Sequence, residues 1–244
     1  MTDFPHDLED THTPTLGLIV LQVDETIETD FRRMLPPDTV RLHVTRIPSG
    51  ADLTPETIAG MEATLPAAAA LLPPAARFDA IGYACTSGTT LIGAARVREL
   101  ILQATPSAAV TDPLTAALAA LRALGLRRIG LVSPYVAEVA APVAAAFQSA
   151  GVEVAATLSF GQQVEARVAR IAPASIRAAA TALAGETPMD GLFLSCTNLR
   201  TLDVLPVLEA ELQVPVLSSN QLLAWHMARA AGLSLPGPGH LFTV

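Results

Sequence analysis

The chain contains FDAIGYACT at residues 78–86 and a second version of the same pattern, MDGLFLSCT, at residues 189–197. In both, an Asp precedes an apolar run that ends in Cys-Thr. Cys85 and Cys196, the only cysteines in the 244 residues, are separated by 111 positions. Similarity at a fixed spacing is the signature of a repeated structural unit. The sequence therefore predicts two similar halves with one cysteine in each.

Other segments repeat in the same order. LGLIV at 16–20 matches IGLVS at 129–133, and VTDPLTAALAALRALGL at 110–126 loosely matches LSSNQLLAWHMARAAGL at 217–233. Apolar, often β-branched runs alternate with Ala/Leu/Arg-rich helical patterns, which predicts an α/β fold with parallel sheets. The expected strands lie at residues 16–21, 41–47, 79–85, 107–110, 128–133, 152–158, 190–196 and 214–217. We expect two pseudo-symmetric lobes, each a four-stranded parallel sheet flanked by helices.

Capping residues define one helix clearly, at residues 113–124. Asp112 can cap it, Pro113 fits its first turn, and Gly125 suits the left-handed position after its end. The loops that follow the two cysteines are expected to lead into further helices, at about 89–103 and 203–212.

Both cysteines follow a buried strand, so both are expected at the carboxyl end of a sheet, where ligands bind in α/β proteins. Backbone N–H groups in the following loops, TSGTT and TNLRT, could bind a carboxylate and favour a neighbouring thiolate. Two facing thiols could then take a proton from one face of a carbon acid and deliver one to the other face. This places the active site in the cleft between the lobes.

Structural roles for the cysteines are the alternative. A lone cysteine that ends a strand is usually a small buried apolar residue. A disulfide is not expected in a cytoplasmic chain, and the five scattered histidines give no metal-ligand spacing, so we predict no metal site. The repeated Cys-Thr context favours chemistry over packing for this pair.

Composition excludes several functional classes. The formal net charge of −8 argues against nucleic acid or anionic membrane as a partner. All fifteen basic residues are arginines, which excludes a Schiff-base lysine and a phosphate-loop lysine. No apolar stretch reaches membrane-spanning length, and residues 1–14 are acidic and lack an apolar signal core. We expect a disordered tail at 1–14 and a cytoplasmic protein.

The pair CTSGT and CTNL, one in each half, resembles the aspartate/glutamate racemase superfamily. The similarity is greater to the branch that holds maleate cis–trans isomerases, arylmalonate decarboxylases and the ectoine-utilisation protein EutA. It covers about residues 15–242 and includes PY at 134–135 and SCTNLRTLDVLPVLEAELQVPVLSSN at 195–220. The resemblance implies a first lobe of residues 15–112 plus 219–244, a second lobe of residues 113–218, and catalysis without a cofactor.

Site residues follow from the resemblance by position. Cys85 and Cys196 match the two catalytic cysteines of the racemases and isomerases, whereas the decarboxylases have glycine in place of the first. Tyr135 matches a tyrosine that contacts substrate in maleate isomerases, although it could also be a plain loop aromatic. The positions that match carboxylate-binding loop residues are Thr86, Ser87, Thr197 and Asn198.

Two positions depart from the isomerase pattern. Asp24 stands where the isomerases have a substrate-binding asparagine, and a second family asparagine aligns loosely near Gln163. An anion at residue 24 would repel a dicarboxylate and attract a substrate with an ammonium group. Asp24 could equally be a helix cap, since DETIE precedes a helical run.

We therefore expect a cofactor-independent racemase or isomerase of a small carboxylate. Amino-acid racemisation of the EutA type is favoured, because VDETIE is more similar to those sequences, which are proposed racemases of a diamino acid. Maleate isomerisation through covalent thiol addition is the alternative. A non-catalytic small-molecule binding protein is the alternative of another class. A homo-oligomer, dimer or tetramer, is also expected.

Overall fold

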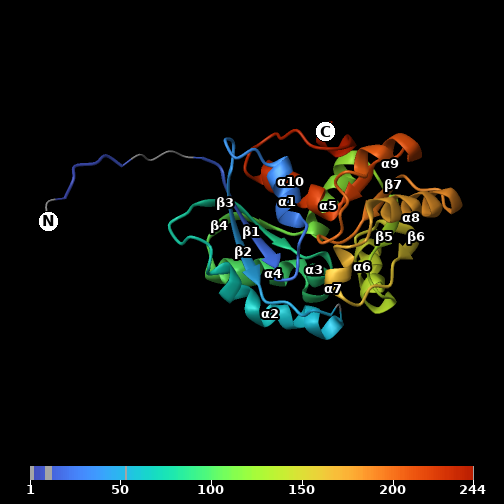
Figure 1. Ribbon diagram of the computed structural model, residues 1–244, viewed down its shortest axis with the longest axis horizontal. Coiled ribbons are helices and arrows are strands. Elements are labelled where there is room, and N and C mark those ends of the chain that lie inside the picture. Colours follow the sequence, from blue (N-terminus) through green and yellow to red (C-terminus); the bar gives the residue numbers. More distant parts are fainter. Residues whose placement is uncertain (1–2, 9–12, 53, 244) are drawn as a thin grey trace.

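The computed structural model describes residues 3–8, 13–52 and 54–243. It contains two four-stranded parallel sheets, with strand orders β2-β1-β3-β4 and β6-β5-β7-β8. The identical order in the two halves is that expected of a duplication, and the predicted fold class is confirmed (Figure 1). The strands are β1 (Thr15–Leu21), β2 (Arg41–Ile47), β3 (Phe78–Ala84), β4 (Ser107–Thr111), β5 (Arg128–Ser133), β6 (Glu153–Ser159), β7 (Gly191–Leu194) and β8 (Val216–Ser218).

The central strands carry the longest apolar runs because both of their faces are covered by helices. Every residue of β1 is buried, and so is every residue of β7. The edge strands β2 and β6 instead alternate exposed and partly buried residues over most of their length. The core therefore runs through the middle of each sheet, and each cysteine follows a central strand, Cys85 after β3 and Cys196 after β7.

Helices flank both sheets on their two faces (Figure 1). Their bounds are α1 (Ile27–Met34), α2 (Pro55–Ala69), α3 (Thr86–Ile92), α4 (Ala94–Ala104), α5 (Pro113–Leu124), α6 (Ala137–Ser149), α7 (Glu165–Val168), α8 (Pro173–Glu186), α9 (Leu205–Leu212) and α10 (Ser219–Ala230), followed by a 3₁₀ turn, η1 (His240–Thr243). None of the described helices is both long and apolar enough to cross a membrane.

The single helix predicted at about 89–103 is wrong in detail, because the structure has two helices there. The first, α3, begins at Thr86, directly after Cys85, and ends at Ile92, before Gly93. Gly93 has φ of 93°, a left-handed conformation that glycine adopts without steric cost, so the chain turns there before α4 begins. The earlier start places Cys85 itself at the N-cap of α3.

Helices α5 and α10 pack against each other at the junction of the two halves. They are the equivalent helices of the repeat, since α5 follows β4 and α10 follows β8. The predicted signals for α5 are confirmed: Asp112 Oδ1 accepts from Thr115 N at 2.8 Å, and Gly125 has φ of 70°. The packing of like helices is what a pseudo-twofold arrangement requires.

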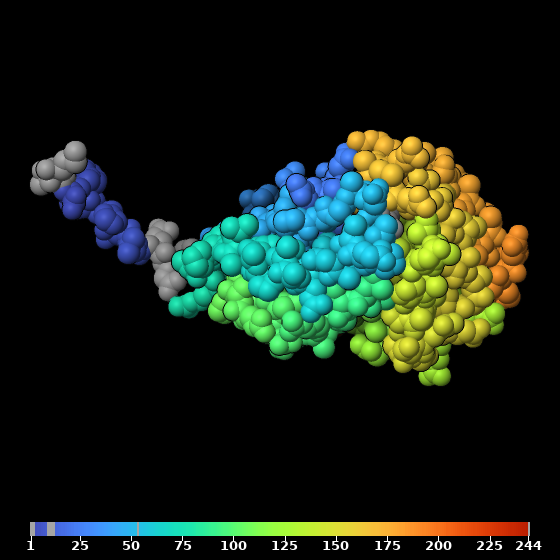
Figure 2. Space-filling model, turned by 90° about the horizontal axis from the view of Figure 1, so that it is seen from below, coloured from blue at the N-terminus to red at the C-terminus, as the bar shows by residue number. Residues whose placement is uncertain are grey.

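The two halves lie side by side in space-filling view, with residues up to about 110 on one side and the segment from about 130 to 210 on the other (Figure 2). Residues 3–8 have no helix or strand and extend away from the folded body (Figures 1 and 2). The rest of the predicted tail, residues 1–2 and 9–12, lies outside the described residues. The lobe boundaries at 112 and 218 stay a prediction.

Candidate active site

Cys85 lies at the carboxyl end of β3 and caps the following helix. Its Sγ accepts a hydrogen bond from the backbone N–H of Gly88 at 3.1 Å and lies 3.7 Å from Ser87 Oγ. The thiol is buried, with 3% of the residue exposed. Burial raises the pKa of Cys85 to about 12, while the Gly88 N–H and the Ser87 hydroxyl lower it. Burial therefore disfavours the thiolate of Cys85, and the Gly88 N–H and the Ser87 hydroxyl are hydrogen-bond donors that would stabilise it.

Cys196 follows β7 at the equivalent place in the second sheet and has an unusual backbone. Its φ is 118°, in the left-handed region that residues with a Cβ rarely adopt, and its N–H donates to Ser219 Oγ at 3.0 Å. Burial raises the pKa of Cys196 well above its ordinary value, and the carboxyl of Glu165 adds to the increase. Strained backbone of this kind is found at sites where a reactive group must be held in one direction.

Ser219, the first residue of α10, connects the two cysteine loops. Its Oγ lies 2.8 Å from Thr86 Oγ1 and also accepts the N–H of Cys196. Thr197 Oγ1 in turn donates to the carbonyl of Ala84 at 3.2 Å. The residues that follow the two thiols are thus bonded across the junction, so the structure brings Cys85 and Cys196 into one buried site.

Asn198 bonds its side chain to protein groups on both sides of the junction. Its Oδ1 accepts from the N–H of Glu25 at 2.9 Å, and its Nδ2 lies 3.2 Å from Glu165 Oε2. Its carbonyl accepts from Thr26 Oγ1 at 2.9 Å. Together with the bond from Thr197 to the carbonyl of Ala84, these bonds show that Thr197 and Asn198 connect the two halves, whereas Thr86 is bonded to Ser219 of α10.

Asp24 caps the entry to α1, as one of the two sequence interpretations expects. Its Oδ1 accepts from Thr26 N at 2.8 Å and from Ile27 N at 2.9 Å. Its Oδ2 is buried and has no hydrogen-bond partner among the described residues. Burial raises the pKa of Asp24, and the two backbone N–H groups partly oppose that increase. The side chain therefore caps a helix and retains one unused acceptor.

Glu165 is a site residue that the sequence interpretation missed. It begins the short helix α7, is 4% exposed, and lines the same cavity as Cys85 and Ser87. Burial raises the pKa of Glu165 to about 7, although the hydrogen bond from Asn198 lowers it in part. The negative charge of Glu165 raises the pKa of both Cys85 and Cys196. Gln163, two residues earlier, is exposed and lines a surface groove with Thr54 and Glu138, so the structure does not bring it to the thiols.

Tyr135 follows β5 and is buried beside Cys196. The residue is 1% exposed, and a hydrogen bond from its hydroxyl lowers the pKa of Cys196. Burial raises the pKa of Tyr135 well above its ordinary value, so the phenol stays protonated and remains a donor. The structure therefore places Tyr135 at the second thiol.

The cavity beside Cys85 is small. Its volume is about 10 Å³, which is close to the minimum for one water molecule. Of the described residues that line it, none is an arginine, and the acids are Glu165 and Asp52. No group of three or more His, Cys, Asp or Glu side chains in the described part of the chain could hold a metal ion. In this structure the cavity therefore has room for about one water molecule and not for a substrate.

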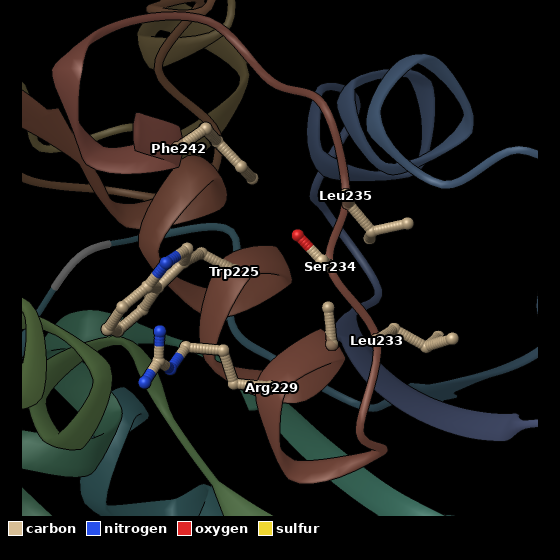
Figure 3. A pocket seen from close by; sticks show the side chains of 7 residues that line it. Trp225, Arg229, Leu233, Ser234, Leu235 and Phe242 are labelled. Atoms are coloured by element: carbon tan, nitrogen blue, oxygen red, sulfur yellow. The ribbon is translucent and has the colours of Figure 1, made fainter. Parts of the chain in front are cut away.

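Another cavity lies away from the thiols, at the C-terminal end of α10 (Figure 3). It has a volume of about 70 Å³ and is lined by Trp225, Arg229 and Phe242, together with Leu233 to Leu235. The guanidinium of Arg229 lies 5.0 Å from the centre of the Trp225 ring, a cation–π contact. This cavity contains no thiol or carboxyl group, so it does not share the chemistry of the cysteine site.

The duplicated fold, with one buried cysteine after a central strand in each half, defines a class of two-lobed α/β proteins. Comparison with known proteins gives the family within that class. The family model for arylmalonate decarboxylase matches residues 93–242, and the chain belongs to the arylmalonate decarboxylase family.

Individual relatives cover nearly the whole chain. Arylmalonate decarboxylase of Bordetella bronchiseptica is 31% identical, over 96% of this chain and 99% of that protein. Maleate isomerase of Nocardia farcinica is 27% identical, over 93% of this chain and 94% of that protein. A solved structure of the Nocardia enzyme, a Cys→Ser variant with a covalently bound succinylcysteine intermediate, has a TM-score of 0.86 at 26% identity, with 95% of this chain and 98% of that chain covered.

These relatives confirm the predicted resemblance and the prediction that the chain is an enzyme of this superfamily. The chain is a cysteine-dependent enzyme of the isomerase and racemase type.

Proposed function

We propose that the protein is a cofactor-independent racemase of a small amino acid, with Cys85 and Cys196 as its acid and base. One thiolate removes the α-proton and becomes a thiol, and the other thiol donates its proton to the opposite face and becomes a thiolate. No proton, electron or group is gained or lost overall. The observation that carries the proposal is the pairing of the chain's only two thiols in one buried site that also contains two carboxyl groups.

The carboxyl groups support a substrate with a positive charge. Asp24 and Glu165 are both buried, and the charge of each raises the pKa of Cys196. A dicarboxylate would add further negative charge to a site that already disfavours thiolates. An ammonium group would instead neutralise a carboxylate, and it would lower the pKa of a nearby thiol. The site therefore favours an amino acid over a plain dicarboxylate.

Binding of the substrate carboxylate is assigned to the loops after the two cysteines. Ser87 is the most available of the proposed side chains, because its only described contact is the 3.7 Å approach to Cys85. Thr86, Thr197 and Asn198 are bonded to protein groups in this structure, so we propose that they bind the substrate after exchanging these bonds. Tyr135 is proposed to act beside Cys196, and Gln163 at the outer groove that a substrate would meet first.

Maleate cis–trans isomerisation is the second candidate, supported by the maleate isomerases among the relatives and by the presence of both cysteines. In that reaction one thiolate adds to the double bond, the new single bond rotates, and the adduct eliminates the thiolate. Decarboxylation is less well supported, because Cys85 stands where the decarboxylases have glycine according to the sequence resemblance.

Incubation in D₂O separates the two candidates. L- and D-amino acids, including diamino acids, and maleate would each be incubated with the enzyme and followed by ¹H NMR. We expect at least one amino acid to lose its α-proton signal, since racemisation replaces that proton by deuterium. Conversion of maleate to fumarate with no α-exchange in any amino acid would favour the isomerase.

Cysteine variants test the assignment of the thiols. Cys85→Ala and Cys196→Ala should each abolish turnover while the fold is retained. Full turnover in either variant would refute the two-thiol mechanism. Ligand binding without turnover in the native enzyme, unaffected by either substitution, would indicate the non-catalytic binding protein instead.

A further inference from the structure

The chain has two tyrosines and two cysteines. As a hydrogen-bond partner, Tyr83 lowers the pKa of Cys85, and Tyr135 lowers the pKa of Cys196. Tyr135 acts beside Cys196 in the proposed function. Tyr83 is adjacent to Cys85 and has no role in the proposed function so far. Its position suggests a role in the chemistry of Cys85.

The side chains of Tyr83 and Cys85 lie on the same face of the sheet, at the point where β3 ends. Side chains two residues apart on a strand point to the same face. Tyr83 is fully buried, with 0% of the residue exposed, so its hydroxyl has only protein partners. The hydroxyl donates to Met61 Sδ at 3.6 Å. A thioether sulfur is a weak acceptor, which leaves the donor poorly satisfied.

Gly88 shows how closely the hydroxyl and the thiol approach. A Cβ atom on this residue would lie 2.6 Å from Tyr83 Oη and 2.8 Å from Cys85 Sγ. The oxygen and the sulfur therefore face the same small space beside Gly88. The absence of a side chain there lets the Gly88 N–H reach Cys85 Sγ at 3.1 Å. A phenol and a backbone N–H thus flank one sulfur.

We propose that Tyr83 is a positioning residue for Cys85, whose hydroxyl turns from Met61 Sδ to Cys85 Sγ when the thiolate forms. This proposal deepens the proposed function, since it rests on Cys85 exchanging protons. In this step the Tyr83 hydroxyl rotates about its C–O bond, and the phenol keeps its proton.

The physical reason is the low polarity of the site. A buried thiolate needs several donors, and no arginine lines the cavity in the described part of the chain. With Gly88 N–H and Ser87 Oγ, the Tyr83 hydroxyl would supply a third donor. Burial raises the pKa of Tyr83 well above its ordinary value, so the phenol keeps its proton and can donate throughout. A thiolate is a far better acceptor than a thioether, which gives the hydroxyl a reason to turn.

Alkylation of Cys85 tests the proposal without any substrate. In a Cys196→Ala background Cys85 is the only thiol, and its reaction with iodoacetamide can be followed by mass spectrometry from pH 6 to 10. Tyr83→Phe should slow the reaction at each pH by roughly tenfold to a hundredfold, the range expected for loss of one hydrogen bond to an anion. Met61→Leu should leave the rate unchanged or raise it, because it removes the competing acceptor.

Tyr135→Phe in the same background is the matched control, since it removes an equivalent buried hydroxyl that lies beside residue 196. It should change the alkylation rate of Cys85 by less than about threefold. Equal rates for Tyr83→Phe and its parent, with the fold of both verified by circular dichroism, would overturn the proposal. Because the assay needs no turnover, a slowed Tyr83→Phe variant would support this role even if no amino acid were racemised.

Discussion

Asn198 donates from Nδ2 to Glu165 Oε2 at 3.2 Å, so the loop that follows Cys196 is bonded directly to helix α7. The same amide accepts, through Oδ1, the N–H of Glu25 in the first half of the chain. One side chain therefore fixes the loop of the second thiol, the buried acid beside both thiols and the loop that contains Asp24. This junction therefore helps to position the reacting groups that follow the two sheets.

Replacement of Asn198 tests that structural role. Asn198→Ala would leave the buried Glu165 carboxyl and the Glu25 N–H without their partner, and we expect a loss of about 1–3 kcal/mol in the free energy of unfolding. Urea denaturation followed by tryptophan fluorescence measures it. Arg33→Ala is the control, because the exposed Arg33–Asp203 pair also joins the halves but should contribute less than about 1 kcal/mol. Equal midpoints for Asn198→Ala and the native protein would contradict this role.

Glu165 should make stability depend on pH. Its folded pKa of about 7 lies above the ordinary 4.5, so the folded state binds a proton that the unfolded state releases. Stability is then greatest below about pH 4.5 and falls as the pH rises through 7, by about 3 kcal/mol for this group alone. Glu165→Gln, measured by urea midpoints between pH 5 and 8, should flatten that decline and stabilise the protein at pH 8. The exposed Glu186→Gln is the control and should leave the pH dependence as it is in the native protein.

Gly88 should not tolerate a side chain. A Cβ at this position would meet Tyr83 Oη at 2.6 Å and Cys85 Sγ at 2.8 Å, so one of them must move. We expect Gly88→Ala to destabilise the protein by about 1–3 kcal/mol and to displace Cys85, with loss of most activity. Gly60→Ala, on an exposed turn of α2 where a Cβ meets nothing within 4 Å, should instead stabilise by up to about 1 kcal/mol. The thermal midpoints of the two variants should shift in opposite directions. A shift of both midpoints in the same direction would contradict this packing.

The strands and the duplicated cysteines could be predicted from the sequence because their signal is local. Buried apolar runs and the repeated Cys-Thr ends are consecutive residues, and the fold follows from them. Glu165 could not be found in this way. It begins a helix of four residues with no apolar period, and its burial comes from contacts with Asn198 and the carbonyl of Ala51, both distant in sequence. Both roles of Asp24 are predicted from the sequence as alternatives, but a capping pattern does not reveal that Oδ2 is buried without a partner among the described residues.

Removal of the two carboxylates should change which substrate the site accepts. Asp24→Asn keeps the Oδ1 acceptor that caps α1, and Glu165→Gln keeps the acceptor for Asn198, so both substitutions remove charge with little change of shape. Two like charges about 4 Å apart cost roughly 4 kcal/mol at an effective dielectric of 20, a factor of several hundred in affinity. We therefore expect the double variant to bind maleate at least tenfold more tightly than the native protein and to lose activity on an ammonium-bearing substrate.

Calorimetric titration with maleate measures the first effect, and loss of the α-proton in D₂O measures the second. Glu25→Gln, which removes a neighbouring exposed carboxylate paired with Arg170, is the control and should change neither. Unchanged maleate affinity in the double variant would show that these acids do not face the substrate, and the preference for an ammonium group would have to be abandoned.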